Sequence, residues 1–259
     1  LRWLAEECSD VHFYPYAAIK CLVFMRIMIQ FPEGLKQQAM EEAAKLEAQG
    51  HDVLISAAPC YGACDLCIDE ARNVKAEKII HFGHAEFMKV KTDIEIEYVP
   101  YFSGLDWKVG KRVLDRALKM LAEQKARTVA LVFPVQHLEN SKKVKEYLEE
   151  SGLEVKLGAG GGHVRHPGQV LGCDSDAVVN AGEIDAVVYF GGGKFHPTGI
   201  PSAKPVLCAD PHLGDSYWIT DEIRRVERKR QGSILAATKA KTFGILVSNY
   251  VIAEHENTI

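Results

Sequence analysis

One strand–helix–strand layout occurs twice in this chain, and the repeat constrains the fold more than any other feature. The first copy starts with the apolar segment RIMIQF (26–31). A Pro-x-Gly turn follows it, and then LKQQAMEEAAKLEAQ carries apolar side chains at helical spacing up to Gly50. HDVLIS (51–56) predicts the next strand. The second copy repeats this order with TVALVFP (128–134), ENSKKVKEYLEESG (139–152) and LEVKLG (153–158). This alternation predicts parallel sheets flanked by helices.

The similarity between the copies continues beyond these units. Each copy next has a loop in which aspartate follows cysteine, then a strand that ends in Phe-Gly, and then one more strand. The matching segments are YGACD (61–65) with VLGCD (170–174), EKIIHFGHAEF (77–87) with DAVVYFGGGKFHP (185–197), and IEIEYVPYF (94–102) with KPVLCADP (204–211). AKTFGILVS (240–248) resembles the first strand of a third copy.

We therefore expect an α/β protein made of repeated Rossmann-like domains with parallel sheets in a pseudo-threefold arrangement. The third copy would be largely missing from this chain. The expected divisions are an N-terminal lead-in (1–25), a first domain (26–125), a second domain (126–239) and the start of a third domain (240–259).

Charge and composition exclude several classes of function. The 259 residues carry a net charge of -4, which does not favour nucleic acid as a partner. No run of about 20 apolar residues predicts a membrane span. Seven cysteines form an odd, clustered set without an export signal, which favours metal binding or catalysis in a reducing cytoplasm over disulfides.

Two cysteines are selected by the repeat, one in each copy. Sites in parallel sheets form at the carboxyl ends of the strands, and both Cys-Asp loops follow predicted strands. Cys64 and Cys173 are therefore the candidate ligands of a [4Fe-4S] cluster, which requires thiolates. Cys8, Cys21 and Cys208 are expected to be structural.

Two other interpretations of the cysteines remain open. Cys60, Cys64 and Cys67 form a C-x3-C-x2-C pattern, which is typical of the cluster loop of ordinary radical S-adenosylmethionine (SAM) enzymes. Alternatively, Cys64 and Cys67 are half of a zinc site completed by the pair His81 and His84 or the pair His163 and His166. The first alternative predicts an enzyme with a local cluster, and the second a non-enzymatic binding module.

Glycine-rich loops supply candidate cofactor contacts, because glycine lets backbone amides approach a ligand closely. Two such loops, at 158–168 and 191–196, follow predicted strands and are the expected seat of SAM. The candidate contacts are Gly160, Gly161, Gln169, Gly191, Gly192, Gly193 and His196. His81, His84 and His137 also follow or end strands, and no side chain is assigned a catalytic role.

Several motifs in combination resemble the diphthamide synthesis enzymes, and among them the archaeal, homodimeric form. The resemblance covers residues from about 26 to 248 and rests on IQFPEGLK, YGACD, HFGHAEF, HPGQVLGCD, FHPTGI and AKTFGILVS in this order. It implies three α/β domains that each give one cysteine to a central [4Fe-4S] cluster. Cys64 and Cys173 match two of these cysteines, and the third would lie in a domain that this chain lacks.

The resemblance also implies an activity. SAM would be cleaved between sulfur and the methionine γ-carbon, giving methylthioadenosine and a 3-amino-3-carboxypropyl radical. The radical would be transferred to a histidine of translation elongation factor 2. An electron donor would be needed as a further partner, and neither nucleic acid nor a membrane is expected to take part.

Overall fold

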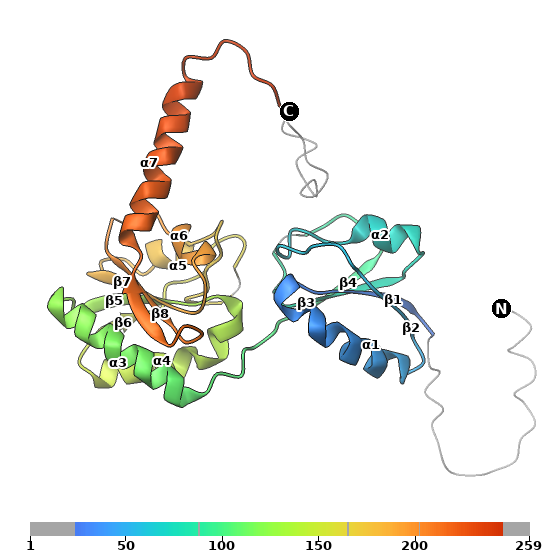
Figure 1. Cartoon of the computed structure of the whole chain (residues 1–259), viewed down its shortest axis with the longest axis horizontal. Coiled ribbons are helices and arrows are strands. Elements are labelled where there is room, and N and C mark those ends of the chain that lie inside the picture. The colour runs from blue at the N-terminus through green and yellow to red at the C-terminus, as the bar shows by residue number, and fades with distance from the viewer. Residues whose placement is uncertain (1–23, 88, 165, 202, 246–259) are drawn as a thin grey trace, which may run out of the picture.

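The computed structural model describes residues 24–245 except positions 88, 165 and 202. It consists of two α/β units joined by an extended segment at 100–106 (Figure 1). The predicted lead-in (1–25) and the start of the third domain (240–259) lie largely outside the described residues.

The first unit contains a four-stranded parallel sheet. Its order is β2 (Asp52–Ile55), β1 (Arg26–Gln30), β3 (Lys78–Phe82) and β4 (Glu95–Val99). A 3-10 turn, η1 (Glu33–Gln38), leads into α1 (Ala39–Glu47), which buries Ala39 and Ala43 against one face. The short helix α2 (Ile68–Asn73) packs on the other face around Met28 and Ile79. The predicted strand and helix positions are thus confirmed here.

The second unit repeats this strand order and adds one strand. The order is β6 (Glu154–Lys156), β5 (Thr128–Val132), β7 (Ala186–Phe190), β8 (Val206–Asp210) and β9 (Asp215–Trp218). The first four strands are parallel and β9 is antiparallel to β8, so the edge strand β9 departs from the predicted repeat. Its other elements are η2 (Val135–Asn140), α4 (Ser141–Glu150), α5 (Asp176–Val179) and α6 (Phe195–Thr198).

The helix α3 (Trp107–Glu123) belongs to the second unit and corrects the expected boundary at residue 125. Its buried residues Val113, Leu114 and Leu121 join the core formed by β5, β7 and β8. Asp106 caps the helix by accepting a 2.9 Å hydrogen bond from the backbone N–H of Lys108. The helix follows the first sheet in sequence, but its apolar face is buried by the second, so the division lies in the segment before it.

The two units also match in their side-chain packing. Phe31 stacks on Phe82 at 4.3 Å between ring centroids in the first unit, and Phe133 meets Phe190 edge-on at 5.9 Å in the second. The glycine after each second phenylalanine lies against the proline that follows the unit's first strand. A Cβ at Gly83 would come within 2.8 Å of Pro32, and one at Gly191 within 2.7 Å of Pro134. The Phe-Gly signature therefore marks a tight contact between neighbouring strand ends.

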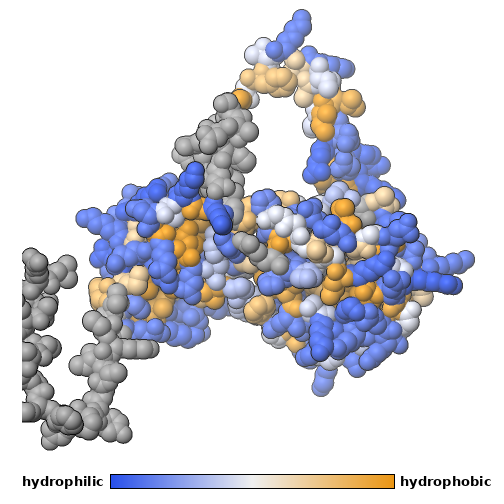
Figure 2. Space-filling view, turned by 180° about the vertical axis from the view of Figure 1, so that it is seen from behind, coloured by the Kyte–Doolittle hydropathy of each residue, from blue (hydrophilic) through white to orange (hydrophobic). Residues whose placement is uncertain are grey.

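The helix α7 (Thr220–Ala237) extends away from both units (Figure 1). Only Ile223 of this helix is buried, and the charged run RRVERKR (224–230) is solvated. Figure 2 shows hydrophobic groups among the hydrophilic ones toward the far end of α7 and the segment that follows it. Ile234, Leu235 and Phe243 are exposed in this part of the chain. Within the described part of the chain, no helix combines the length and apolarity that a membrane span needs.

Candidate functional site

The carboxyl ends of the two sheets face each other. Beyond β3, the carbonyl oxygen of Gly83 accepts a 3.3 Å hydrogen bond from the side chain of Gln136, which follows β5. The ring of Phe87 stacks on that of His163 with 4.2 Å between centroids, and the Nδ1 of His163 donates a 3.2 Å hydrogen bond to the carbonyl of Phe87. Loops that follow strands in different units are thereby held against each other.

Cys64 and Cys173 lie on loops at this junction, near enough for the charge of one to act on the other. Cys64 lies half-buried in the loop after β2, and Cys173 lies exposed in the loop before α5. Burial raises the pKa of the Cys173 thiol, and the nearby Cys64 thiolate raises it further. Burial also raises the pKa of Cys64, and the charge of Asp65 adds to the effect. Two thiolates held close together repel each other, and a bound cationic iron centre would relieve that repulsion.

The aspartate after each cysteine holds its loop in place. Asp65 accepts a 3.1 Å hydrogen bond from the backbone N–H of Tyr61. Asp174 accepts two, from the backbone N–H groups of His163 at 2.9 Å and Asp176 at 3.1 Å. Both aspartates are buried, so they position the cysteines rather than meet solvent. The shared Cys-Asp pair was visible in the sequence, but its role as a loop anchor was not.

Cys60 and Cys67, the other members of the local C-x3-C-x2-C pattern, are buried. Cys67 packs in the apolar cluster between α2 and the first sheet. Burial raises the pKa of Cys60 to about 11 and that of Cys67 to about 12. Cys208 is fully buried in β8, as expected of a structural cysteine. The burial of Cys67 in a core makes the local loop a poorer cluster site than the pair Cys64 and Cys173.

Three of the candidate SAM contacts are packed against the protein itself. A Cβ at Gly160 would lie 2.6 Å from the carbonyl oxygen of Val164, and one at Gly161 would lie 2.0 Å from the carboxylate of Asp176. Gln169 is buried, and its Oε1 accepts a 3.2 Å hydrogen bond from the backbone N–H of His166. These three positions have a structural explanation: the loop folds tightly against its own neighbours.

The other candidate contacts surround a cavity at the end of the second sheet. Its volume is about 320 Å³, and its lining includes Gly192, Gly193 and His196. His137 and His212 line it too, with their Nε2 atoms 3.2 Å apart. Gly191 lies beside this cavity and makes the proline contact described above. Gly192, Gly193 and His196 thus lie together at one strand end, and His212, which the sequence did not single out, lies with them.

The candidate histidines at these strand ends are buried (His81 and His137) or half-buried (His84 and His196). Burial lowers the pKa of His81 to about 3 and those of His84 and His137 to about 4. A nearby histidine adds to the lowering for each of them, and for His84 this is His196 of the other unit. Burial also lowers the pKa of His196, whose Nδ1 is buried without a hydrogen-bond partner among the described residues. All four imidazoles are therefore neutral at physiological pH.

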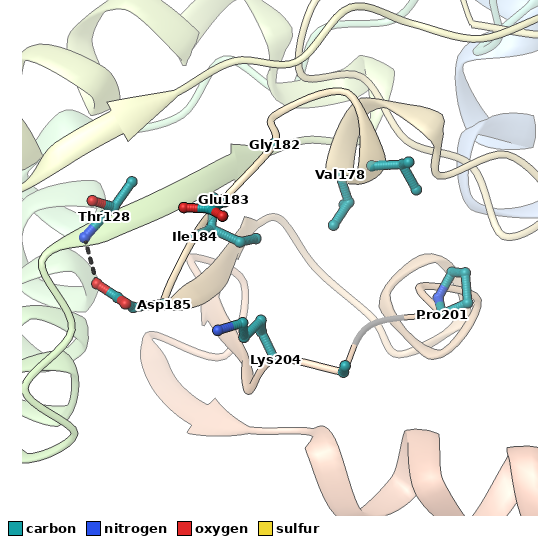
Figure 3. Close-up of a pocket in the computed structure, with 10 residues that line it drawn as sticks. Thr128, Val178, Gly182, Glu183, Ile184, Asp185, Pro201 and Lys204 are labelled. Atoms are coloured by element: carbon teal, nitrogen blue, oxygen red, sulfur yellow. Dashed lines mark hydrogen bonds between the residues drawn. The ribbon is translucent and has the colours of Figure 1, made fainter.

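A second cavity, of about 820 Å³, lies at the opposite end of the second sheet. Figure 3 shows Thr128, Asp185 and Lys204 around it, with a hydrogen bond from the backbone N–H of Thr128 to Asp185. These residues begin or precede strands, whereas the cysteine loops follow strands. Although this cavity is the larger of the two, no cysteine lines it, so it is not part of the candidate site.

Comparison with known proteins agrees with this geometry. The family model of the diphthamide synthesis protein matches residues 31–259. The 2-(3-amino-3-carboxypropyl)histidine synthase of Pyrococcus horikoshii is 36% identical over 227 residues, covering 86% of this chain and 63% of that protein. Subunit 1 of the human 2-(3-amino-3-carboxypropyl)histidine synthase is 28% identical, covering 86% of this chain and 50% of that subunit.

The structural comparison gives the same relative. The crystal structure of Dph2 from Pyrococcus horikoshii with a 4Fe-4S cluster superposes with a TM-score of 0.75 at 32% identity, covering 90% of this chain and 67% of that one. This chain thus spans between half and two thirds of the length of these curated relatives. The match to the family model over most of the chain, and the identity to the archaeal enzyme, show that this chain belongs to the diphthamide synthesis protein family.

Proposed function

We propose that this chain is part of a SAM-dependent 3-amino-3-carboxypropyl transferase that modifies a histidine of translation elongation factor 2. The observation that carries the proposal is that the loop of Cys173, through His163, contacts the first unit, where Cys64 lies on the matching loop and its charge reaches Cys173. The similar Dph2 structure is described with a 4Fe-4S cluster, and the similar enzymes are named as synthases of the modified histidine.

Cys64 and Cys173 would hold the cluster, and their thiolates suit iron. When bound, the cluster would supply the electron that splits SAM into methylthioadenosine and the 3-amino-3-carboxypropyl radical. Asp65 and Asp174 would keep the two thiols in place through their backbone hydrogen bonds. The exposure of Cys173 leaves this side of the site open to a protein substrate.

The cavity that contains His137 and His196 is the proposed seat of SAM. Burial lowers the pKa values of His137 and His196, so these two neutral rings can donate and accept hydrogen bonds without placing a positive charge beside the sulfonium. The glycines at 191–193 keep the strand end free of side chains, and Gly193 has a positive φ of 76°. Orienting the γ-carbon and excluding water would be the main contributions of these residues. Gly160, Gly161 and Gln169 would act indirectly, by shaping the loop that leads to Cys173.

A third α/β domain would supply the third ligand and complete a pseudo-threefold arrangement. The comparison of α3 with α7 supports this proposal. Both helices follow the last strands of a unit, but α3 buries its apolar face on the next sheet whereas α7 has only Ile223 buried. A next domain that starts near residue 240 would cover α7 as the second unit covers α3. We further propose a homodimer in the reducing cytoplasm, served by a separate electron donor.

The test is an anaerobic reconstitution of a longer protein that includes this chain. Iron and sulfide are added, the protein is reduced, SAM is supplied and the small products are identified by mass spectrometry. Methylthioadenosine is expected, together with loss of both cluster absorbance and product in Cys173→Ala. Cys208→Ala removes a core thiol of the same domain and is the matched control, which should keep both.

The opposite outcome would support the ordinary radical SAM interpretation. Deoxyadenosine as the product, with the cluster intact in Cys173→Ala, would assign the cluster to the local loop of Cys60, Cys64 and Cys67. A colourless protein that holds zinc in place of iron and yields no SAM product would instead support the zinc-binding module.

A further inference from the structure

A second group of metal-ligating side chains lies in the first unit and shares no residue with the pair Cys64 and Cys173. The potential ligand atoms of Cys60, His81 and His84 all lie within 4.8 Å of one another. Cys60 and His81 are buried and His84 is half-buried. They come from two segments, the loop after β2 and the end of β3, so the group joins parts of the chain that are separate in sequence.

The hydrogen bonds of Gln30 fix the orientation of the His81 ring. The side-chain amide of Gln30 donates a 2.8 Å hydrogen bond to the backbone carbonyl of Asp65, which can only accept. Its Oε1 therefore faces the backbone N–H of Cys67, at 3.3 Å, and the Nδ1 of His81, at 2.9 Å. Since Oε1 can only accept, Nδ1 of His81 carries the proton. Nε2 then keeps its lone pair and points at Nδ1 of His84, 2.9 Å away.

This arrangement is the one that surrounds metal-binding histidines. A ligating imidazole usually donates its other N–H to an oxygen behind it, which sets the tautomer and the direction of the lone pair. Gln30 has that position behind His81. Burial lowers the pKa values of both His81 and His84, so both rings are in the neutral state that metal ions require.

The second unit shows that the fold alone does not require this group. Gln30 pairs with His81 in the register of β1 and β3, and the matching pair of β5 and β7 is Val132 with Tyr189. The second pair packs into an apolar cluster. The hydrogen-bonded set of Gln30, His81 and His84, with Cys60 beside it, is therefore particular to the first unit. A purely structural role would be met by apolar side chains.

The geometry points to a binding site for one zinc-class divalent cation formed by Cys60, His81 and His84, distinct from the proposed cluster site. Thiolate sulfur and imidazole nitrogen are both ligands of Zn²⁺, and three protein ligands leave a fourth position for water. In the metal-free state Nδ1 of His84 donates its proton to Nε2 of His81, and on metal binding that proton would move to Nε2 of His84. A tetrahedral ion holds two nitrogen ligands roughly 3.3 Å apart, so the two rings would also separate by a few tenths of an ångström. Coordination would release the thiol proton of Cys60. The ion would tie the loop that carries Cys64 to the end of β3.

The experiment uses the chain with Cys64→Ser and Cys173→Ser, which removes the ligands of the proposed cluster. The metal-free protein is titrated anaerobically with Co²⁺ and followed by absorbance. One equivalent should bind, with tetrahedral d–d bands and a sulfur-to-cobalt charge-transfer band, and Zn²⁺ should displace it. Since this background lacks both cluster ligands, the result does not depend on the proposed transferase activity.

Two further substitutions in this background test the assignment. Cys60→Ser should abolish the charge-transfer band, and His84→Gln should weaken Co²⁺ binding by at least about tenfold, the range typical for disturbed metal sites. Cys67→Ser is the matched control on the same loop and should leave the band unchanged. The proposal is overturned if no stoichiometric Co²⁺ binds, or if the band persists in Cys60→Ser. If Cys60→Ser does not fold, unchanged affinity in His84→Gln overturns it.

Discussion

At one matched position near the strand ends, the first sheet carries a polar pair and the second an apolar one. In the first unit, Gln30 and His81 lie next to each other on β1 and β3 and are linked by a hydrogen bond. In the second unit, Val132 and Tyr189 have the same places and join an apolar cluster. A repeat thus preserves the backbone path and the glycine–proline contacts, while the side chains at the strand ends diverge. We expect the second unit to have the more stable core and the first to be more sensitive to changes in polar groups.

The largest expected effect on the free energy of unfolding comes from substituting Phe190 and Phe82, which have matching positions in the two units. Phe190 is fully buried between the sheet and its helices, whereas Phe82 is only half-buried. Phe190→Ala should lower the free energy of unfolding by about 4 kcal/mol, and Phe82→Ala by about 2 kcal/mol, because the smaller loss of buried surface leaves a smaller cavity.

The two units can be followed separately during this unfolding. Trp107 and Trp218 both pack against the core of the second unit. With Trp3→Phe as the background, tryptophan fluorescence in urea reports the second unit, and far-ultraviolet circular dichroism reports both. Equal losses in the two variants would show that the two cores are equally packed and would contradict the comparison.

The next largest effect is a loss of stability in acid, which arises from the buried His137 of the second unit. Burial lowers the folded-state pKa of His137 to about 4 against an ordinary value of 6.5; the charge of His212 also lowers it and that of Asp210 raises it. Between these values the unfolded chain binds more protons, so stability falls as the pH drops from about 6.5 to about 4. The shift corresponds to a loss of about 3 kcal/mol across this window.

The test is urea unfolding of His137→Gln followed by tryptophan fluorescence at pH 7, 5.5 and 4.5. The variant should be less stable at pH 7, because it loses the hydrogen bond to Ser103, but its stability should depend less on pH. A variant as sensitive to acid as the original chain would assign the acid dependence to other groups.

The glycine–proline contacts should differ between the units for a backbone reason. Gly83 has a φ of 90°, whereas the φ of Gly191 is not positive, and a Cβ at either position would meet a proline ring. Gly83→Ala adds backbone strain to overpacking and should cost about 2 kcal/mol, against about 1 kcal/mol for Gly191→Ala. Thermal unfolding of the two variants measures the difference. If Gly191→Ala were the more harmful change, the proline ring would be the dominant obstacle and not the backbone.

Sequence alone predicted the two parallel sheets, because apolar strands, helical spacing and terminal glycines alternate in a fixed order. It did not predict that α3 packs on the second sheet. The helix has a clear apolar face, but nothing local to the sequence states which sheet covers Val113 and Leu114. The antiparallel strand β9 was missed for a similar reason, since its four residues, DSYW, carry almost no periodic signal.

For the site, the repeat brought out Cys64 and Cys173 because each is followed by aspartate after a matching strand. Glycines were a weaker guide. Gly193 lines a cavity and has open space where a Cβ would lie, whereas protein atoms lie close to the Cβ positions of Gly160, Gly161 and Gly192. A single sequence does not distinguish a glycine that admits a ligand from one that admits a neighbouring side chain. The group of Cys60, His81 and His84 depends on contacts across the fold that spacing alone does not reveal.

The smallest expected effect is a difference in stability between substitutions of the two loop aspartates, Asp174 and Asp65. Asp174 uses both carboxylate oxygens as acceptors of backbone N–H groups, and Asp65 uses one. In Asp174→Asn an NH₂ group must face a backbone donor, so one hydrogen bond is lost at a cost of about 1 kcal/mol. In Asp65→Asn the amide can turn its oxygen toward Tyr61, so the change should be close to zero. Thermal unfolding compares the two, and iron titration should show a looser cluster only in Asp174→Asn. Equal effects would mean that charge, and not the number of accepted hydrogen bonds, is what these aspartates contribute to the cysteine loops.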